Sequence, residues 1–135
     1  MQLTGQCYCG DIRYEANGDP ILRVQCHCRE CQYLSGGGPN YTLGMPAEGF
    51  SYTQGKPSQF TRTDIDNAVT REFCTRCGTQ ILTRVPALPQ VVLIKVGTLD
   101  EPAAFGTPEM AIFTIDRQVF HLLPEDIPSF ERMPG

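Results

Sequence analysis

Seven cysteines, unevenly distributed, constrain this chain more than any other feature of its sequence. They form two pairs and one group of three: Cys7 and Cys9, Cys74 and Cys77, and Cys26, Cys28 and Cys31. Two pairs can supply the four sulfurs of a closed structural zinc site. Three sulfurs leave one position of a tetrahedral zinc ion for water or a substrate, which is the arrangement of reactive zinc. The spacing therefore predicts two zinc ions per chain, one that holds the fold and one that does chemistry.

The number and spacing of the cysteines favour metal binding over disulfides, because seven is odd and CxC and CxxC spacings are typical of metal sites. Residues Met1 to Gly5 contain neither the basic segment nor the apolar run of a signal peptide. The longest apolar stretch, Val91 to Val96, is interrupted by Lys95 and is too short to span a bilayer. We expect a soluble, cytoplasmic protein without membrane contact; disulfide bonding is the alternative.

Composition limits the fold and the partners. A chain of 135 residues, 41% of them hydrophobic, has the size of one domain and enough apolar surface for a core, so we expect a single domain over residues 1–135. The 13 glycines and 11 prolines favour turns over long helices. The net charge of −4 and the lack of a basic stripe argue against nucleic-acid binding. No feature predicts an oligomeric state.

Short runs of β-branched and aromatic residues, bounded by Gly, Pro and Asn, predict a mainly β protein. The expected strands cover residues 12–15, 21–25, 41–43, 50–53, 59–63, 69–73, 80–85, 91–96, 111–115 and 119–123. Residues 64–67 are expected at a hairpin tip, and strands 80–85 and 91–96 as the core pair. One or two helical turns are expected over Arg29 to Leu34, ended by Gly36, and one over Asp100 to Phe105, which has an N-cap candidate. The tail from about Pro124 is expected to be irregular.

The two cysteine pairs share a local pattern. Each pair is followed by a glycine, Gly10 or Gly78, and then by an apolar strand. Glycine adopts positive φ without steric cost, so the chain can bend tightly around an ion and aim its N–H groups at sulfur. A metal bound by both pairs would tie the start of the sheet to its middle and offset the entropy of closing that long loop. The alternative is that Cys7 and Cys9 are ordinary buried cysteines.

The group of three has its own geometry. Side chains alternate along an extended segment, so Cys26 and Cys28 face one side while His27 faces the other. Cys31 follows Cys28 by three residues at the start of a turn and can converge on the same ion. Zinc with three thiolates carries a net charge of −1, which suits binding and activating a thiol. In the alternatives, His27, Glu30 or a partner chain completes the shell, or the group stays without metal at rest.

Two further features could contact a substrate. The loop Ser35 to Gly38 is expected to expose backbone N–H groups that could bind a carboxylate, or else to be a flexible turn. Four basic residues could meet an anionic substrate, and the sequence does not rank them: Arg62, Arg71, Arg76 and Lys95. No general base is obvious, although His27 and Glu30 are near in the chain.

Taken together, the cysteine segments resemble the glutathione-dependent formaldehyde-activating family, also called the GFA or CENP-V domain. The matching residues are Gly5, Cys7, Cys9, Gly10, Ile12 and Tyr14; Cys26, His27, Cys28, Cys31, Ser35 and Gly36; Phe73, Cys74, Cys77, Gly78 and Thr79; and Val96 to Asp100 with Pro102 and Ala103. The likeness covers nearly the whole chain. It implies an Mss4-like, zinc-stabilised fold of packed antiparallel sheets with one or two short helical turns.

The same resemblance implies roles for the cysteines and an activity. Cys7, Cys9, Cys74 and Cys77 match the ligands of a structural zinc ion. Cys26, Cys28 and Cys31 match those of a second zinc ion, which is tied to glutathione and catalysis. The implied reaction joins glutathione to formaldehyde and gives S-(hydroxymethyl)glutathione, as a carbon–sulfur lyase does. A small thiol and an aldehyde are therefore the expected partners.

Two departures and two alternatives accompany this interpretation. Many family members have His-Ile near Ala111-Ile112 and a tryptophan near Phe120, which this chain lacks; if those residues shape the pocket, its substrate differs. A non-enzymatic zinc module that binds a protein or a thiol is the main alternative. Thiol–disulfide chemistry at Cys28 and Cys31 is less favoured, because Cys26 beside them indicates metal and no thioredoxin-like pattern surrounds them.

Overall fold

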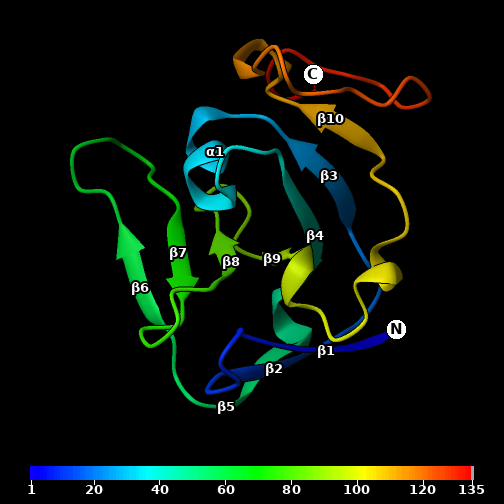
Figure 1. Ribbon diagram of the computed structural model, residues 1–135. Helices are drawn as coiled ribbons and strands as arrows, with labels where there is room; N and C mark the ends of the chain where they lie inside the picture. Colours follow the sequence, from blue (N-terminus) through cyan, green and yellow to red (C-terminus); the bar gives the residue numbers. More distant parts are fainter. Residues whose placement is uncertain (135) are drawn as a thin grey trace.

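The computed structural model describes residues 1–134 and consists of two β-sheets with one short helix (Figure 1). The strands are β1 Gln2–Gln6, β2 Arg13–Asn17, β3 Leu22–Cys26, β4 Asn40–Pro46, β5 Phe50–Gln54, β6 Ser58–Thr61, β7 Thr70–Phe73, β8 Gln80–Arg84, β9 Val91–Lys95 and β10 Met110–Ile112. The helices are α1 Arg29–Ser35 and the 3₁₀ turns η1 Ala47–Gly49, η2 Val96–Thr98, η3 Pro102–Phe105 and η4 Thr114–Asp116. The prediction of a mainly β fold is confirmed.

The larger sheet has seven strands in the order β10-β3-β4-β9-β8-β7-β6. All its pairs are antiparallel except β10 with β3, which run parallel. The predicted hairpin is confirmed, since β6 and β7 pair across the tip at residues 62–69. The predicted core pair is also confirmed: β8 lies next to β9, and both carry fully buried residues such as Leu82 and Ile94.

The smaller sheet, β1-β2-β5, packs against one face of the larger sheet. Alternate residues of β2, Tyr14 and Ala16, point into the shared core and are almost completely buried. From the large sheet, Leu43 and Met45 on β4 meet them in the same apolar cluster. This follows the two-residue period of a strand, in which one face is apolar. Strand β1 was not among the strands predicted from the sequence.

Helix α1 covers part of the other face of the large sheet, over β4. It begins after Cys28, whose Sγ accepts the Cys31 N–H at 3.3 Å, and it ends at Gly36, which adopts the left-handed conformation. The predicted helix and its glycine end are therefore confirmed. The turn predicted over Asp100 to Phe105 is also present as η3, but its N-cap position, Glu101, makes no side-chain capping bond.

The C-terminal part differs from the prediction. Phe113 has φ of 53° and ends β10, so the strand expected over residues 111–115 stops early. A strand over residues 119–123 is wrong: His121 N–H donates to Gln118 O in a turn, and Val119 and Leu122 are exposed. Residues 124–134 contain no helix or strand, yet they lie along β10, where Ala111 N–H donates to Pro128 O and Phe130 N–H donates to Ala111 O (Figure 1).

Candidate metal and active site

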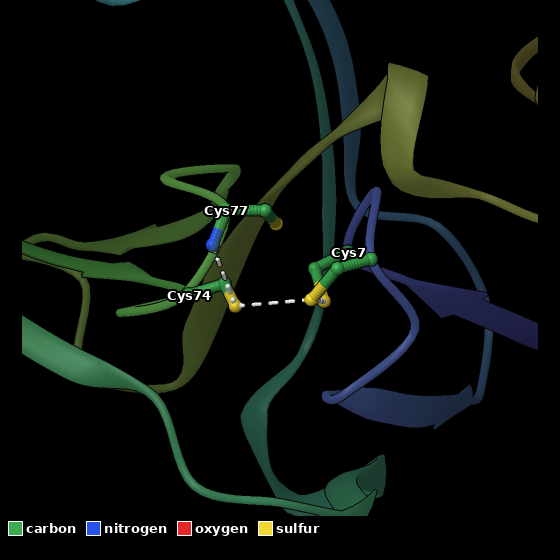
Figure 2. Close-up of side chains that lie close together, drawn as sticks. Cys7, Cys74 and Cys77 are labelled. Carbon is green, nitrogen blue, oxygen red and sulfur yellow. Dashed lines mark hydrogen bonds between the residues drawn. The ribbon is translucent and has the colours of Figure 1, made fainter.

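The two cysteine pairs form the first group, to which segments far apart in the chain contribute. Cys7 and Cys9 follow β1, whereas Cys74 and Cys77 lie in the turn between β7 and β8. Figure 2 shows Cys7 facing Cys74 and Cys77 across a short gap. The four sulfurs lie within 4.8 Å of one another, and no other His, Cys, Asp or Glu among residues 1–134 joins them. All seven cysteines of the chain are free thiols, as predicted.

The spacing of these sulfurs fits a tetrahedral zinc ion. Zinc–sulfur bonds of about 2.3 Å place neighbouring sulfurs of a tetrahedron about 3.8 Å apart. The measured separations are 3.6 Å for Cys7 and Cys9 and 3.7 Å for Cys9 and Cys74. Backbone N–H groups already point at the sulfurs: Ile12 N–H donates to Cys7 Sγ at 3.3 Å. The four-cysteine group is therefore preorganised for a cation with four thiolate ligands.

One member of this group, Cys77, has surroundings that favour its thiolate, whereas burial and the neighbouring thiols raise the pKa of Cys9. A hydrogen bond from the Thr79 hydroxyl, 3.1 Å from Cys77 Sγ, lowers the pKa of Cys77 to about 5. Cys77 N–H also points at Cys74 Sγ, 3.5 Å away. Both glycines that follow the pairs have positive φ, 83° at Gly10 and 78° at Gly78, as the tight bends require. Gly78 N–H closes the second bend by donating to Cys74 O.

The remaining three cysteines form the second group at the junction of β3 and α1. Cys26 is the last residue of β3, Cys28 is the N-cap of α1, and Cys31 lies in its first turn. Their sulfurs also lie within 4.8 Å of one another. Cys26 and Cys31 are buried, whereas Cys28 is partly exposed. Hydrogen bonds from Cys26 and Cys28 lower the pKa of Cys31 to about 3, while the same contacts raise the pKa of Cys26.

His27 and Glu30 are not part of the three-cysteine group. The His27 ring is fully buried on the opposite side of the chain, where its Nε2 lies 3.0 Å from Gln25 Nε2 and its Nδ1 has no hydrogen-bond partner. Glu30 points outward and pairs with Arg71 at 2.7 Å. Neither joins the three sulfurs, so the alternative in which one of them completes the metal shell finds no support in this geometry.

A buried polar network behind α1 holds the second group in place. Gln32 donates from Nε2 to His27 O and to Asp116 O, both at 2.9 Å. His121 accepts the Gln118 N–H at Nδ1 and therefore donates from Nε2 to Gly37 O at 2.7 Å. The network joins the helix, the glycine loop and the C-terminal segment. The sequence analysis named neither Gln32 nor His121. The only signal for Gln32 was its polar side chain on the inner face of a short helix, and His121 had no such signal.

The glycine loop does not offer the N–H groups that the sequence suggested. Gly36 and Gly37 both donate their N–H groups to Gln32 O, which closes the end of α1. The hydroxyl of Ser35 donates to Gly38 O. The expectation of an exposed anion-binding loop is therefore wrong at Gly36 and Gly37, because the helix C-cap uses their donors first.

Two polar residues on the sheet face the second group: Asn40, which the sequence analysis did not name, and Lys95, one of the four basic candidates that the sequence did not rank. Asn40 lies opposite Cys26, and Lys95 lies opposite Thr42, so strand alternation places all four side chains on one face of the sheet. Asn40 is buried, and its amide lies close enough to lower the pKa of Cys31, but Nδ2 has no partner with hydrogen-bond geometry. A buried Asn beside thiols leaves a donor available to a ligand.

Lys95 adds a positive charge to the three-cysteine group. No ion-pair or hydrogen-bond partner of its ammonium is found among residues 1–134. Burial lowers the pKa of Lys95 to about 8, and the negative charge of Cys31 opposes this effect. A charged residue inside the apolar run 91–96 was the signal in the sequence. The other three basic residues are paired with carboxylates: Arg62 with Asp64, Arg71 with Glu30 and Arg76 with Asp11.

The two groups thus define different kinds of site. The first can enclose a cation with four sulfurs, and the second can hold a cation with three sulfurs beside an ammonium and an amide. A cation bound at the first would link distant segments of the chain, whereas the second keeps polar groups near its sulfurs that a ligand could contact. No helix among residues 1–134 is long and apolar enough to cross a membrane.

Comparison with known proteins agrees with this architecture. The family model described as glutathione-dependent formaldehyde-activating enzyme matches residues 2–116, which is most of the chain. The chain therefore belongs to the glutathione-dependent formaldehyde-activating enzyme family. A search of curated proteins returns no match.

The solved structures include a similar fold. The crystal structure of a Rhodobacter sphaeroides protein is 16% identical, covers 93% of this chain and 98% of that one, and superimposes with a TM-score of 0.61. At this identity the likeness concerns the fold alone. The fold is Mss4-like, with two sheets and one helix, as the resemblance implied.

The two departures from the family pattern lie in β10 and in the segment after it, which contact β3 and the loop after α1. Ala111 is completely buried on β10, next to Gln25 of β3. Phe120 is 68% exposed and packs edge-on against His121, with ring centroids 4.8 Å apart. Through His121, this ring is connected to the glycine loop at Gly37.

Proposed function

We propose that this protein is a zinc-dependent enzyme of the carbon–sulfur lyase type, in which a small thiol adds to an aldehyde at the three-cysteine group. The observation that carries the proposal is the contrast between four sulfurs around one point and three sulfurs around another, the latter near the ammonium of half-buried Lys95. The whole chain, residues 1–135, would act as one domain. Its seven free thiols suit a reducing compartment, the cytoplasm.

Both cysteine groups suit zinc. Cys7, Cys9, Cys74 and Cys77 would hold a structural ion, and Cys26, Cys28 and Cys31 would hold a second one. Bound at the second group, zinc supplies a lowered thiol pKa, so that the incoming sulfur stays a nucleophilic thiolate at neutral pH. The protein contributes the positions of the three sulfurs. The start of α1 holds Cys28 and Cys31, which are three residues apart, and the end of β3 holds Cys26.

The residues around the second group suit the aldehyde. When the thiolate attacks the carbonyl carbon, a carbon–sulfur bond forms and the π electrons move to oxygen, which then takes up a proton. The Lys95 ammonium lies on this side of the sheet and can stabilise the negative oxygen and protonate it. The Asn40 amide can donate a further hydrogen bond. The thiol releases its proton to solvent, and this proton balances the one that the carbonyl oxygen takes up.

The identity of the substrates rests on the family. Its description names glutathione and formaldehyde, and for this chain we propose glutathione or a similar small thiol with formaldehyde or another aldehyde. The product with glutathione and formaldehyde would be S-(hydroxymethyl)glutathione. The exposed edge at Cys28 gives a small thiol access to the group.

The test combines metal content with exchange kinetics. Because thiols and formaldehyde also react spontaneously, the rate is best measured as exchange between ¹³C-formaldehyde and its glutathione adduct by NMR. The fresh, reduced protein should contain two zinc ions and accelerate the exchange. Lys95→Met should lower this acceleration by roughly 100- to 1,000-fold, as expected for loss of an oxyanion-stabilising group, and Lys95→Arg should restore part of it.

The control for this experiment is Lys56→Met, because Lys56 is exposed and far from the cysteines in the sequence. Its exchange rate should equal that of the unchanged protein. One zinc ion per chain, or two zinc ions without any acceleration, would contradict the proposal. The second result would favour the non-enzymatic zinc module instead.

A further inference from the structure

A hollow of about 250 Å³ lies beside the three-cysteine group, between α1 and the β6–β7 hairpin. Its walls are mainly apolar: Tyr33, Leu34, Phe60, Ile65 and Val69. Figure 1 shows the hairpin standing next to α1. A volume below the roughly 300–1,000 Å³ of sites that bury a whole drug-sized ligand suits one arm of a small molecule rather than a protein segment.

The apolar walls of the hollow are exposed to water. Tyr33 is 78% exposed, Phe60 is 57% exposed and Ile65 is 45% exposed. Single exposed apolar residues are common on proteins, but several that line one concave site indicate a surface that a ligand covers. They come from two elements, the helix and the hairpin, and the hollow is where these elements meet.

The charges around the hollow argue against a carboxylate as its ligand. Arg71 and Arg62 both line it, but each is already paired: Arg71 with Glu30 at 2.7 Å and Arg62 with Asp64 at 2.6 Å. Two guanidinium groups with two carboxylates leave no net positive charge. The hollow therefore favours an uncharged, apolar group over the two carboxylates of glutathione.

The hollow adjoins the reaction site through two of its lining residues, Glu30 and Arg71. Glu30, on its rim, lies between Cys28 and Cys31 in the first turn of α1. Arg71 extends from the hollow to the sheet face that carries Lys95, where its NH1 lies 3.4 Å from the Thr83 hydroxyl. A ligand bound at the three sulfurs can thus extend an arm over the rim at Glu30.

We propose that this hollow binds an apolar arm, about six carbons in size, of the molecules that react at the three-cysteine group. This inference rests on the proposed function and adds a substrate class to it. The preferred substrates are then a thiol and an aldehyde, one of which carries an aliphatic or aromatic group. Formaldehyde and glutathione do not provide such a group. A kinetic experiment distinguishes an arm on the aldehyde from an arm on the thiol.

The kinetic test compares substrates with and without the arm. The zinc-loaded protein is assayed with glutathione plus hexanal, with formaldehyde plus benzyl mercaptan, and with glutathione plus formaldehyde. Ile65→Ser should lower kcat/KM by about tenfold or more for the pair that carries the arm, since lost methylene contacts in an apolar pocket have effects of this size. The glutathione–formaldehyde pair should be unchanged.

Two variants complete the kinetic test. Ile21→Ser is the matched control, because Ile21 is 49% exposed, close to the 45% of Ile65, and lies outside the hollow. It should change none of the pairs. Ala68→Trp, which fills the hollow from the hairpin side, should lower kcat/KM of the arm-bearing pair further than Ile65→Ser and again spare glutathione with formaldehyde.

A binding measurement separates this inference from the proposed function. Unreactive 1-hexanol, titrated into the zinc-loaded protein, should shift the methyl NMR signals of Leu34, Ile65 and Val69 but not those of Ile21. Hexanol binding without any catalysis would contradict the proposed function and leave the apolar site standing. Catalysis with glutathione and formaldehyde, together with no hexanol shifts and no selective loss in either arm-bearing pair, would overturn the inference alone.

Discussion

The two cysteine groups differ in how the chain reaches them, and this difference separates their roles. The four-cysteine group joins segments 65 positions apart, from the start of the chain and from the turn between β7 and β8. The three-cysteine group is local, spanning residues 26–31 at one strand end and one helix start. A metal at the first group closes a long loop, whereas a metal at the second constrains a segment that the helix already orders. We therefore expect folding to depend on the first group, and we assign the proposed chemistry to the second.

The polar surroundings of the two cysteine groups also indicate different roles. Around the first group, backbone N–H groups of Ile12 and Cys77 and the Thr79 hydroxyl are directed at sulfur. Around the second group, the Asn40 amide lacks a partner and Lys95 lacks a counter-ion among residues 1–134. A site whose donors already bond to sulfur is complete, while spare donors beside sulfur suit a ligand that comes and goes.

The largest expected effect is loss of the fold when the four-cysteine group is broken. Cys74→Ser removes one of four ligands from a buried position, and structural zinc sites contribute on the order of 10 kcal/mol to folding. We expect the variant to lose one zinc ion per chain and to show no cooperative thermal unfolding by circular dichroism. A variant that unfolds cooperatively near the temperature of the unchanged protein would show that the first group is not structural.

The next effect is a loss of activity without loss of the fold. Cys28→Ser breaks the three-cysteine group at its partly exposed member, and we expect at least a ~1,000-fold lower exchange rate, comparable with the loss of a catalytic nucleophile or metal ligand. The melting temperature should fall by only a few degrees, since α1 keeps its other contacts. The measurement is zinc content, exchange rate and melting temperature on one preparation. If Cys28→Ser unfolded to the same extent as Cys74→Ser, the two cysteine groups would not differ in their importance for the fold.

The sequence predicts more of the four-cysteine group than of the surroundings of the second. Ligand spacing and the following glycines are local patterns, so Cys7 and Cys77 can be assigned to a shared site from these patterns alone. Asn40 and Lys95 come to the second group only through strand pairing and register, which place β4 beside β3 and β9 beside β4. Register depends on packing across the whole sheet and cannot be read from a short segment.

The fold shows the same limit. Period and turn residues locate most strands. In β1 burial alternates, but its two buried positions are Leu3 and Gly5, and only Leu3 has an apolar side chain that a sequence pattern could reveal. Residues 119–123 have strand-like composition and still form a mostly exposed turn. The reason is that His121 Nε2 makes a hydrogen bond with Gly37 O, which is far away in the sequence. In both cases tertiary contacts override local propensity.

A smaller effect distinguishes glycines near the two groups. A Cβ at Gly5 would overlap the Tyr14 hydroxyl and lie 2.5 Å from Thr98 O, which are backed by the core. Gly5→Ala should therefore lower the free energy of unfolding by about 2–4 kcal/mol through overpacking. Gly38→Ala is the control, because nothing lies within 4 Å of its Cβ position and its φ is not positive. Urea unfolding of both variants measures the difference, and equal stabilities would contradict this packing.

The smallest predicted effect concerns two aspartates and their dependence on pH. Asp100 accepts the Thr4 hydroxyl at 2.6 Å and the Arg13 guanidinium at 2.9 Å, and these contacts hold its pKa below the usual value. A lowered folded-state pKa means that Asp100 stabilises the protein at neutral pH and loses this effect as pH falls through that pKa. Asp100→Asn should lower the melting temperature at pH 7 by about 1–4 °C, the range for an exposed ion pair.

Asp64→Asn is the matched control for this aspartate. Arg62 also lowers the pKa of Asp64, but the two are only two residues apart in an exposed hairpin tip, so the unfolded chain keeps part of their attraction. Asp100 instead joins η2 and η3 to β1 and β2, a contact that exists only in the folded protein. We therefore expect a calorimetric difference between Asp100→Asn and the unchanged protein at pH 7 that narrows below about pH 4, and none for Asp64→Asn at either pH. If Asp64→Asn were as destabilising as Asp100→Asn, long-range contacts near the four-cysteine group would have no special part in holding the sheets together.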